Sequence, residues 1–166
     1  MLENGDLIFV RDGSDMGQAI QTSTGNYNHV AIYLDGMIYH ASEQAGVVCQ
    51  EPADFFESNH LYDIYVYPEL DIQSVKEKAC KHLGEPYNAS FYPDGIGFYC
   101  SQYMLEILPI FETIPMQFGD EKEEIAPFWQ QYYKELGLAV PLHQPGTNPS
   151  QLAQSEKLVY KGRLDD

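Results

Sequence analysis

The chain has 166 residues, with 25 acidic residues against nine basic ones and a formal net charge of −16. This length predicts one domain, residues 1–166, that buries a core of its own without metal or disulfide support. Nucleic acid and anionic membrane surfaces are disfavoured as partners, because both are bound through basic stripes that this sequence lacks. The acidity fits a solvated surface, or a preference for neutral or cationic substrates.

Cysteine usage and the first residues bear on the compartment. Cys49, Cys80 and Cys100 form an odd set without C-x-x-C spacing, so neither a disulfide framework nor a zinc ribbon is expected. The first residues contain no basic leader and the chain contains no long apolar run, so we expect no signal peptide and no membrane span. These features predict a cytoplasmic protein, unless a leader has been trimmed.

The first half of the chain predicts short strands. They are expected at residues 7–10, 29–34, 37–41, 47–50 and 62–67. The second and third of these form a hairpin, because Asp35-Gly36 between two apolar runs is a strong turn signal. Ser14 is placed to cap a short helix that ends at residue 21, and residues 22–26 are expected to form a loop.

The second half predicts helices. Asp71 caps a helix with an apolar face that includes Leu83 and stops at Gly84, and Cys80, next to that face, is expected in the core. Further helices are expected at 100–108 and 125–136, with a short one after the turn at 145–150. Strands early and helices later predict one α+β domain.

Cys100 is expected at a helix start, after the glycine-punctuated stretch that precedes it. The first N–H groups of a helix have no intrahelical partner and the helix dipole is positive there, so this position favours a reactive thiolate. The alternative is a small buried residue that fills space in the core.

Two histidines flank the predicted hairpin. Counting outward from its turn, Ala31 faces His40, and His29 lies two positions further along on the same side. Together with Cys100 they match the pattern of a nucleophile, a base and a residue that orients the base. Alternatively, His29 is only a polar residue at the end of a strand, and His40 only a partner for a hydroxyl group on the neighbouring strand. A structural zinc site is disfavoured because the sequence offers no fourth ligand near these three residues. His60, His82 and His143 are expected on loops or in solvent, without a role.

Five motifs in order resemble those of the circularly permuted, NlpC-type, papain-like cysteine hydrolases. They are NGDLIF at 4–9, NHVAIY at 28–33, IYHA at 38–41, GEPYN at 84–88 and FYCSQ at 98–102. Within this family the chain is most similar to the YiiX/YebB branch, a relative of lecithin:retinol acyltransferase, and residues 146–155 also resemble that branch.

The resemblance implies a papain-like fold, in which an antiparallel sheet or partial barrel packs against helices and the nucleophile starts one of them. It implies Cys100 as nucleophile, His29 as general base and His40 as the residue that orients His29. Tyr87 and Ser101 are expected on the substrate and oxyanion side, although Tyr87 is equally explained as a loop aromatic packed on the core. Position 102, often acidic in relatives, is Gln here.

These residues lead to three hypotheses about function. The first is a cysteine peptidase or amidohydrolase that cleaves small or cell-wall-derived peptides through a thioacyl intermediate, without metal or cofactor. The second is a lipid acyltransferase or thioesterase, which needs an apolar groove that the sequence does not reveal. The third is a ligand-binding module without catalysis. The expected partner is a small peptide or amide; the sequence leaves the oligomeric state open.

Overall fold

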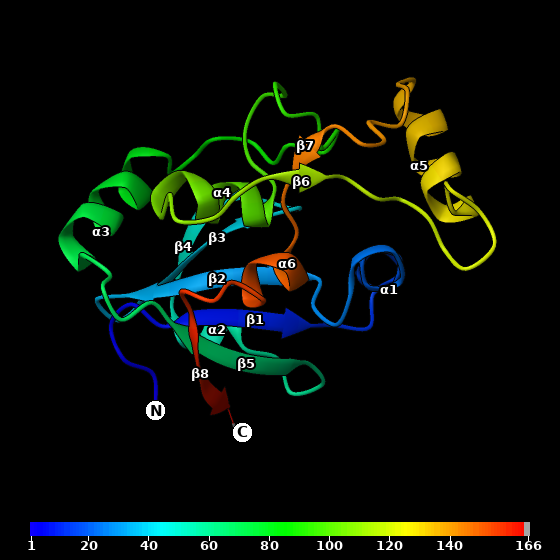
Figure 1. The fold of residues 1–166 in the computed structure, drawn as a ribbon. Coiled ribbons are helices and arrows are strands. Elements are labelled where there is room, and N and C mark those ends of the chain that lie inside the picture. Colours follow the sequence, from blue (N-terminus) through cyan, green and yellow to red (C-terminus); the bar gives the residue numbers. More distant parts are fainter. Residues whose placement is uncertain (165–166) are drawn as a thin grey trace.

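A computed structural model describes residues 1–164 (Figure 1). The strands are β1 (Leu7–Arg11), β2 (His29–Leu34), β3 (Met37–Ser42), β4 (Gly46–Gln50), β5 (Leu61–Val66), β6 (Ile114–Pro115), β7 (Pro145–Gly146) and β8 (Val159–Arg163). The helices are α1 (Asp15–Thr24), α2 (Pro52–Phe55), α3 (Ile72–Lys81), α4 (Cys100–Ile107), α5 (Pro127–Leu136) and α6 (Pro149–Ala153).

Six strands form one antiparallel sheet in the order β4-β3-β2-β1-β5-β8, and β6 pairs with β7 in a separate ribbon. Figure 1 shows α3, α4 and α6 over one face of the sheet, with α5 set apart at the end where β1 leads into α1. This arrangement is the expected α+β architecture of an antiparallel sheet packed against helices.

Strand alternation divides the core between the two faces of the sheet. Phe9 of β1 and Val30 and Ile32 of β2 pack with α4 on one face, in the cluster that includes Cys100. Ile8 and Ala31 belong to a second cluster on the other face, against which Phe55 of α2 packs. A third cluster, called here the aromatic cluster, surrounds α5 and includes Phe91, Phe118, Trp129 and Tyr133.

The predicted hairpin is confirmed, with one difference at its open end. Leu34 pairs with Met37 and Tyr33 with Ile38, as the Asp35-Gly36 turn requires, and Asp35 and Gly36 both have positive φ. The ladder between β2 and β3 stops at the pair Ile32–Tyr39, so Ala31 and His40 are not ladder partners. The two strands therefore part just where the two histidines lie.

Two helices differ from their predicted extents. α1 starts after its Ser14 cap but continues to Thr24, and the hydroxyl groups of Thr22 and Thr24 donate to the carbonyl groups of Gln18 and Ile20 one turn earlier. The predicted loop at residues 22–26 is therefore partly helical.

The prediction for the C-terminal end of α3 and for its apolar face was wrong. The helix stops at Lys81 instead of Gly84, which leaves Leu83 outside the helix and 41% exposed. Cys80 is exposed and not part of the core, and its sulfur lies 3.7 Å from the Tyr39 hydroxyl oxygen. The apolar face of this helix consists of Val75 and Ala79, which are buried, and Ile72, which is partly buried against the core.

Two buried carboxylates hold the last strand against the sheet. Asp63 of β5 accepts hydrogen bonds from Arg163 of β8 and from the Tyr27 hydroxyl. Asp6, just before β1, accepts hydrogen bonds from the Lys161 ammonium group of β8 with both of its carboxylate oxygens. These pairs attach β8 to the edge that β5 would otherwise expose.

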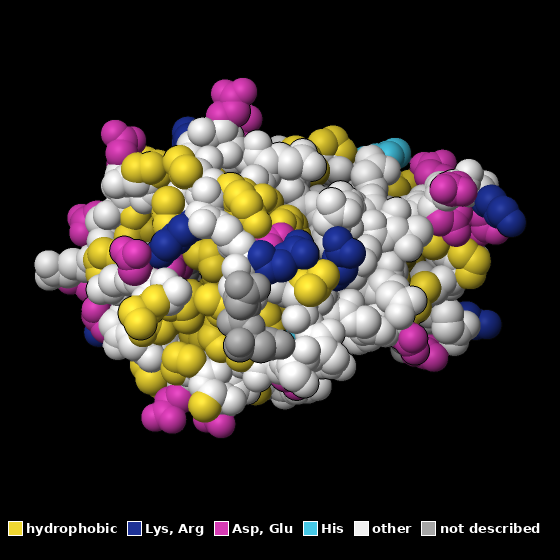
Figure 2. Space-filling view, turned by 90° about the horizontal axis from the view of Figure 1, so that it is seen from below, with side chains coloured by type: hydrophobic (Ala, Val, Ile, Leu, Met, Phe, Trp, Pro, Cys, Tyr) yellow, Lys and Arg dark blue, Asp and Glu magenta, His cyan; other side chains and the backbone are white. Residues whose placement is uncertain are grey.

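Acidic side chains are distributed over the surface of the protein. Figure 2 shows acidic side chains spread around the margin of the molecule on the face viewed, in the manner of a solvated surface. None of the helices within residues 1–164 is long and apolar enough to cross a bilayer.

Gly97 fixes the loop that leads to Cys100. It has φ +85°, and a Cβ atom there would lie 1.9 Å from the Pro86 carbonyl oxygen. The same carbonyl accepts from the Phe98 N–H, and Phe98 in turn accepts from Asn88. A side chain at residue 97 would break the contact that places Tyr87 beside the Cys100 segment.

We expect Gly97→Ala to lower the free energy of unfolding by about 3 kcal/mol, the sum of a left-handed backbone penalty and a steric clash. Gly137→Ala is the matched control: it has φ +71° and nothing within 4 Å of its Cβ position, so only the backbone penalty of about 1 kcal/mol applies. Urea unfolding measures both values, and equal losses would contradict the clash.

Candidate active site

Cys100 is the first residue of α4, as predicted, and is 6% exposed. Tyr99 before it is extended, and the Tyr99 N–H donates to the Gln102 side-chain oxygen at 3.1 Å. The same oxygen accepts from Asn88 of the preceding loop at 3.2 Å. Gln102, where relatives are often acidic, therefore closes the start of the helix and ties it to this loop.

The thiol of Cys100 is protonated at neutral pH, which corrects the expectation of a thiolate. Burial raises its pKa to about 12, and the backbone N–H groups of Val30 and Ser101, which face the sulfur, lower it by less. The helix-start position is as predicted, but loss of solvent outweighs the favourable backbone groups. The negative charge of Glu43 acts in the same direction as burial.

The Val30 N–H joins the sulfur to the beginning of β2. Because the ladder between β2 and β3 ends at Ile32–Tyr39, the ladder does not take up this N–H, which faces Cys100. Val30 directly follows His29 in the chain. Within residues 1–164, no hydrogen bond joins Cys100 to the His29 ring, and the contact of the sulfur with β2 is made by the backbone of Val30.

His29 and His40 lie on the same side of the hairpin, as predicted. His29 Nε2 lies 2.8 Å from His40 Nδ1, and the two rings are nearly perpendicular. His40 Nε2 in turn lies 2.5 Å from the Oε1 atom of Gln50, the last residue of β4. Phe55 of α2 packs edge-on against the His40 ring. Three strands thus contribute one hydrogen-bonded chain of side chains.

These hydrogen bonds determine which ring nitrogens of His29 and His40 carry protons. An amide oxygen only accepts, so His40 Nε2 must donate to Gln50, and neutral His40 is left with an accepting Nδ1. His29 Nε2 then donates to that Nδ1, which leaves His29 Nδ1 with a free lone pair. The neutral pair therefore presents one unprotonated nitrogen outside the hydrogen-bonded chain.

Burial keeps both imidazoles neutral. It lowers the pKa of His29 to about 3, and the nearby rings of His40 and His60 add to this effect. Burial also lowers the pKa of His40, while its bond to Gln50 acts in the opposite direction. His60, to which sequence analysis assigned no role, lines the same pocket as His29, whereas His82 pairs with Glu85 and Glu106 elsewhere.

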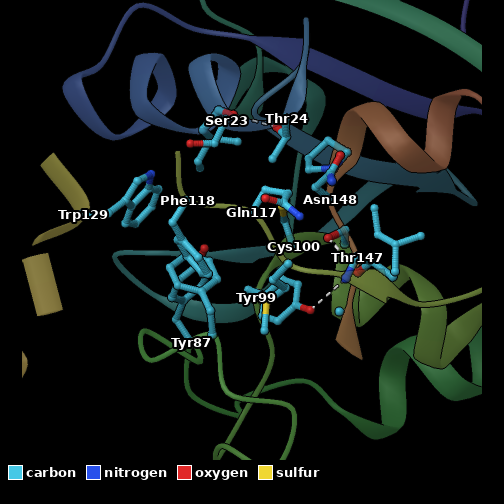
Figure 3. Close-up of a pocket in the computed structure, with 17 residues that line it drawn as sticks. Ser23, Thr24, Tyr87, Tyr99, Cys100, Gln117, Phe118, Trp129, Thr147 and Asn148 are labelled. Carbon is cyan, nitrogen blue, oxygen red and sulfur yellow. Dashed lines mark hydrogen bonds between the residues drawn. The ribbon is translucent and has the colours of Figure 1, made fainter. Parts of the chain in front are cut away.

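Two pockets meet this part of the protein from different sides. The first, called here the apolar pocket, includes Cys100 and encloses about 550 Å³ of atom-free space, its open mouth included (Figure 3). Its walls come from α1, the segment at 87–101, the segment at 114–118, α5 and residues 146–149, and none of its lining residues is charged. The sequence did not reveal this pocket, because its walls come from five separate segments.

The second, called here the polar pocket, is bordered by His29, His40 and Gln50. Its rim carries carboxylates and no lysine or arginine, and the acidic residues are Asp12, Glu43, Asp54 and Glu57. Burial, followed by the charge of Asp12, raises the pKa of Glu43. Glu43 acts on the Cys100 thiol as well as lining this pocket, so it lies near both sides of the site.

Tyr87 and Ser101 both line the apolar pocket beside Cys100, with different surroundings. Burial raises the pKa of Tyr87 well above its usual value, and its hydroxyl makes no hydrogen bond to any described residue. The Ser101 hydroxyl is fully buried and accepts from Thr147 at 2.9 Å. Tyr87 thus keeps a free hydroxyl near the sulfur, while Ser101 offers its backbone N–H.

Sequence reasoning missed Gln50, Glu43 and Thr147. Gln50 stands two residues beyond Val48, the partner of His40, so it shares a face with His40 once β3 and β4 are paired. That pairing was the signal that could have found it. Thr147 is held by a bond from its N–H to the Tyr99 hydroxyl, which no sequence pattern indicates.

The depressed pKa of His29 makes stability depend on pH. The unfolded state binds a proton near pH 6.5 and the folded state only near pH 3, so stability falls as pH drops between these values, by at most about 1.4 kcal/mol per pH unit. We expect His29→Gln to reduce this loss. Urea unfolding at pH 7.5, 6 and 5 measures it, with His143→Gln, on a loop, as control; an unchanged slope in His29→Gln would contradict the buried neutral ring.

Comparison with known proteins identifies the family and the fold. A family model described as the permuted papain-like amidase enzyme, YaeF/YiiX, C92 family, matches residues 1–159. The solved structure of the metalloprotein YiiX from Escherichia coli O157:H7 has a TM-score of 0.77 and 21% identity, over 98% of this chain and 97% of that one, which shows a shared fold. No curated protein matches significantly. The chain belongs to the YaeF/YiiX, or C92, family of permuted papain-like amidases.

Proposed function

We propose that this protein hydrolyses amides with Cys100 as nucleophile, His29 as general base and His40 as the residue that orients His29. The observation that carries the proposal is the hydrogen-bonded series from Gln50 through His40 to His29, which leaves His29 Nδ1 without a partner, one residue along the chain from the Val30 N–H that faces the sulfur. A nucleophile with a nearby base and an orienting group is what acyl transfer requires.

The reaction starts from a neutral thiol and a neutral imidazole. As the sulfur attacks the amide carbonyl, its proton passes to His29 Nδ1, and the resulting imidazolium is stabilised through His40. The Tyr87 hydroxyl and the Cys100 backbone N–H are the donors for the oxyanion. The C–N bond then breaks, the proton passes from His29 to the leaving amine, and a thioester to Cys100 remains. Water, deprotonated by His29, releases the acid and restores the thiol.

The pockets indicate which half of the substrate lies where. The uncharged apolar pocket next to Cys100 suits the acyl half, and the polar pocket beside His29 suits the amine that His29 protonates. The substrate class is therefore a small amide or peptide with an apolar acyl half. The carboxylate-bearing acyl half of a cell-wall peptide is disfavoured, because it would be buried without a counter-charge.

A lipid acyltransferase or thioesterase is the second candidate, and one specific observation favours it. The apolar pocket beside Cys100 is the groove such an enzyme needs and that the sequence did not reveal. The same thioacyl intermediate serves both functions, and only the acceptor differs. A ligand-binding module, the third hypothesis, does not account for the oriented histidine pair.

A metal is not part of this proposal. The E. coli relative of similar fold is described as a metalloprotein. Among residues 1–164, no group of three or more His, Cys, Asp or Glu side chains is arranged to hold a metal ion. Both nitrogens of His40 and one of His29 are used in the hydrogen-bonded chain, so these residues do not fit a metal site.

Amide hydrolysis can be tested with aminocoumarin amides of hexanoic acid and of γ-glutamic acid, beside the hexanoyl thioester. We expect the hexanoyl amide to be preferred, and Cys100→Ala to lower kcat/KM by at least about 1,000-fold because it removes the nucleophile. Cys80→Ala, which replaces an exposed cysteine on α3, is the matched control and should keep full activity.

Hydroxylamine distinguishes the candidate functions. Trapping of the thioacyl intermediate gives a hydroxamate at the expense of the free acid. Turnover that survives Cys100→Ala would contradict the proposed nucleophile. Transfer to an added amine or alcohol in preference to water, on lipid esters only, would favour the acyltransferase.

The role of Gln50 is tested by a pair of variants. Gln50→Leu removes the acceptor that fixes the His40 tautomer, so we expect kcat to fall by about tenfold or more with KM little changed. Gln50→Glu keeps an acceptor and should retain more activity, with an acid limb moved upward because a carboxylate raises the pKa of His40. Equal losses in both variants would show that Gln50 acts only through packing.

A further inference from the structure

The indole N–H of Trp129 is buried without a partner. Trp129 lies on α5 and is 3% exposed, and its Nε1 atom is the one buried side-chain nitrogen or oxygen within residues 1–164 for which no hydrogen bond is found. Buried polar groups in proteins are nearly always paired, and an unpaired one destabilises the fold. The exception therefore calls for a physical explanation.

Its neighbours cannot supply the missing acceptor. The rings of Phe91, Phe118 and Phe128 pack edge-to-face against the indole and carry no oxygen. Tyr132 and Tyr133 donate their hydroxyl hydrogens to Ala89 and Ser90, and neither oxygen accepts from the indole. Within residues 1–164, the N–H is therefore packed among aromatic rings without an acceptor in hydrogen-bond distance.

The indole is also part of the wall of the apolar pocket. Figure 3 shows Trp129 and Phe118 on the side of the pocket across from Thr147 and Asn148, with Cys100 between them, and the indole nitrogen turned toward the α1 wall where Ser23 lies. Ser23 donates its hydroxyl to the Gly119 carbonyl. Among the polar groups of the pocket walls, which include the Tyr87 hydroxyl and the side chains of Gln117 and Asn148, the indole N–H is the one that is fully buried and without a hydrogen bond within residues 1–164.

We propose that Trp129 is a specificity-determining residue, whose N–H binds a neutral hydrogen-bond acceptor carried by the acyl half of the substrate. A ketone, ether or second amide carbonyl fits, whereas a carboxylate does not, because no lining residue is positively charged. The assignment of the acyl half to this pocket rests on the proposed function. The contact requires a small rotation of the indole, a torsion that is broad for tryptophan.

Trp129 is the only tryptophan in the sequence, which makes the test direct. The Cys100→Ala variant is titrated with octanamide and with a series of oxo-octanamides in which the ketone is moved along the chain. We expect one or more oxo-amides to bind about tenfold more tightly than octanamide, the effect of one hydrogen bond to a buried donor. In the ¹H–¹⁵N spectrum the single indole N–H resonance should move downfield with these ligands and not with octanamide.

Trp129→Phe, in the same Cys100→Ala background, should abolish the tenfold preference and leave octanamide binding largely unchanged. Phe128→Leu is the matched control: it changes the neighbouring ring on α5, which does not line the pocket, and should keep the preference. Equal affinity for all ligands, with an unmoved indole resonance, would overturn the inference. Should Trp129→Phe not fold, the resonance alone decides.

This experiment is independent of the proposed function because it needs no turnover. A preference for oxo-amides without hydrolysis by the wild-type enzyme would retain the Trp129 contact and refute the amidase. Hydrolysis of amides with no such preference would do the reverse.

Discussion

The site depends on a ladder that ends early. β2 and β3 are joined by a tight turn, yet their pairing stops at Ile32–Tyr39, before the chain reaches His29. The gap has two effects. It leaves the Val30 N–H to face the Cys100 sulfur, and it gives the His29 and His40 rings room to meet at 2.8 Å. In a hairpin paired along its full length, the Val30 N–H would instead donate to β3 within the sheet. The hairpin turn therefore positions the two histidines, and the unpaired end of the hairpin leaves the Val30 N–H available to the Cys100 thiol.

Removal of water sets the protonation of the resting site. Burial raises the pKa of Cys100 and lowers that of His29, so both groups are neutral at the same pH. An ion pair would have to be held in surroundings that disfavour both charges. In the proposed mechanism, the hydrogen bonds from His29 through His40 to Gln50 would stabilise the charge that arises on His29, with an amide and not a carboxylate in the third position.

The sequence predicted the elements that depend on local patterns. The Asp35-Gly36 turn, the shared face of His29 and His40, and the helix start at Cys100 each follow from a few neighbouring residues, and each is found. What depends on contacts between distant segments was not predictable. The apolar pocket needs five segments to close it. The sign of the Cys100 pKa shift was wrong for the same reason, since burial is a property of the assembled core.

The two pockets give the site two separate exits. Cys100 borders one and the histidine pair borders the other, with the end of β2 between them. In the proposed amide hydrolysis, the amine would leave on the histidine side while the acyl group remains on the cysteine side, and the acceptor would then enter without displacing it. Separate access of this kind is typical of ping-pong kinetics, in which the first product departs before the second reactant binds.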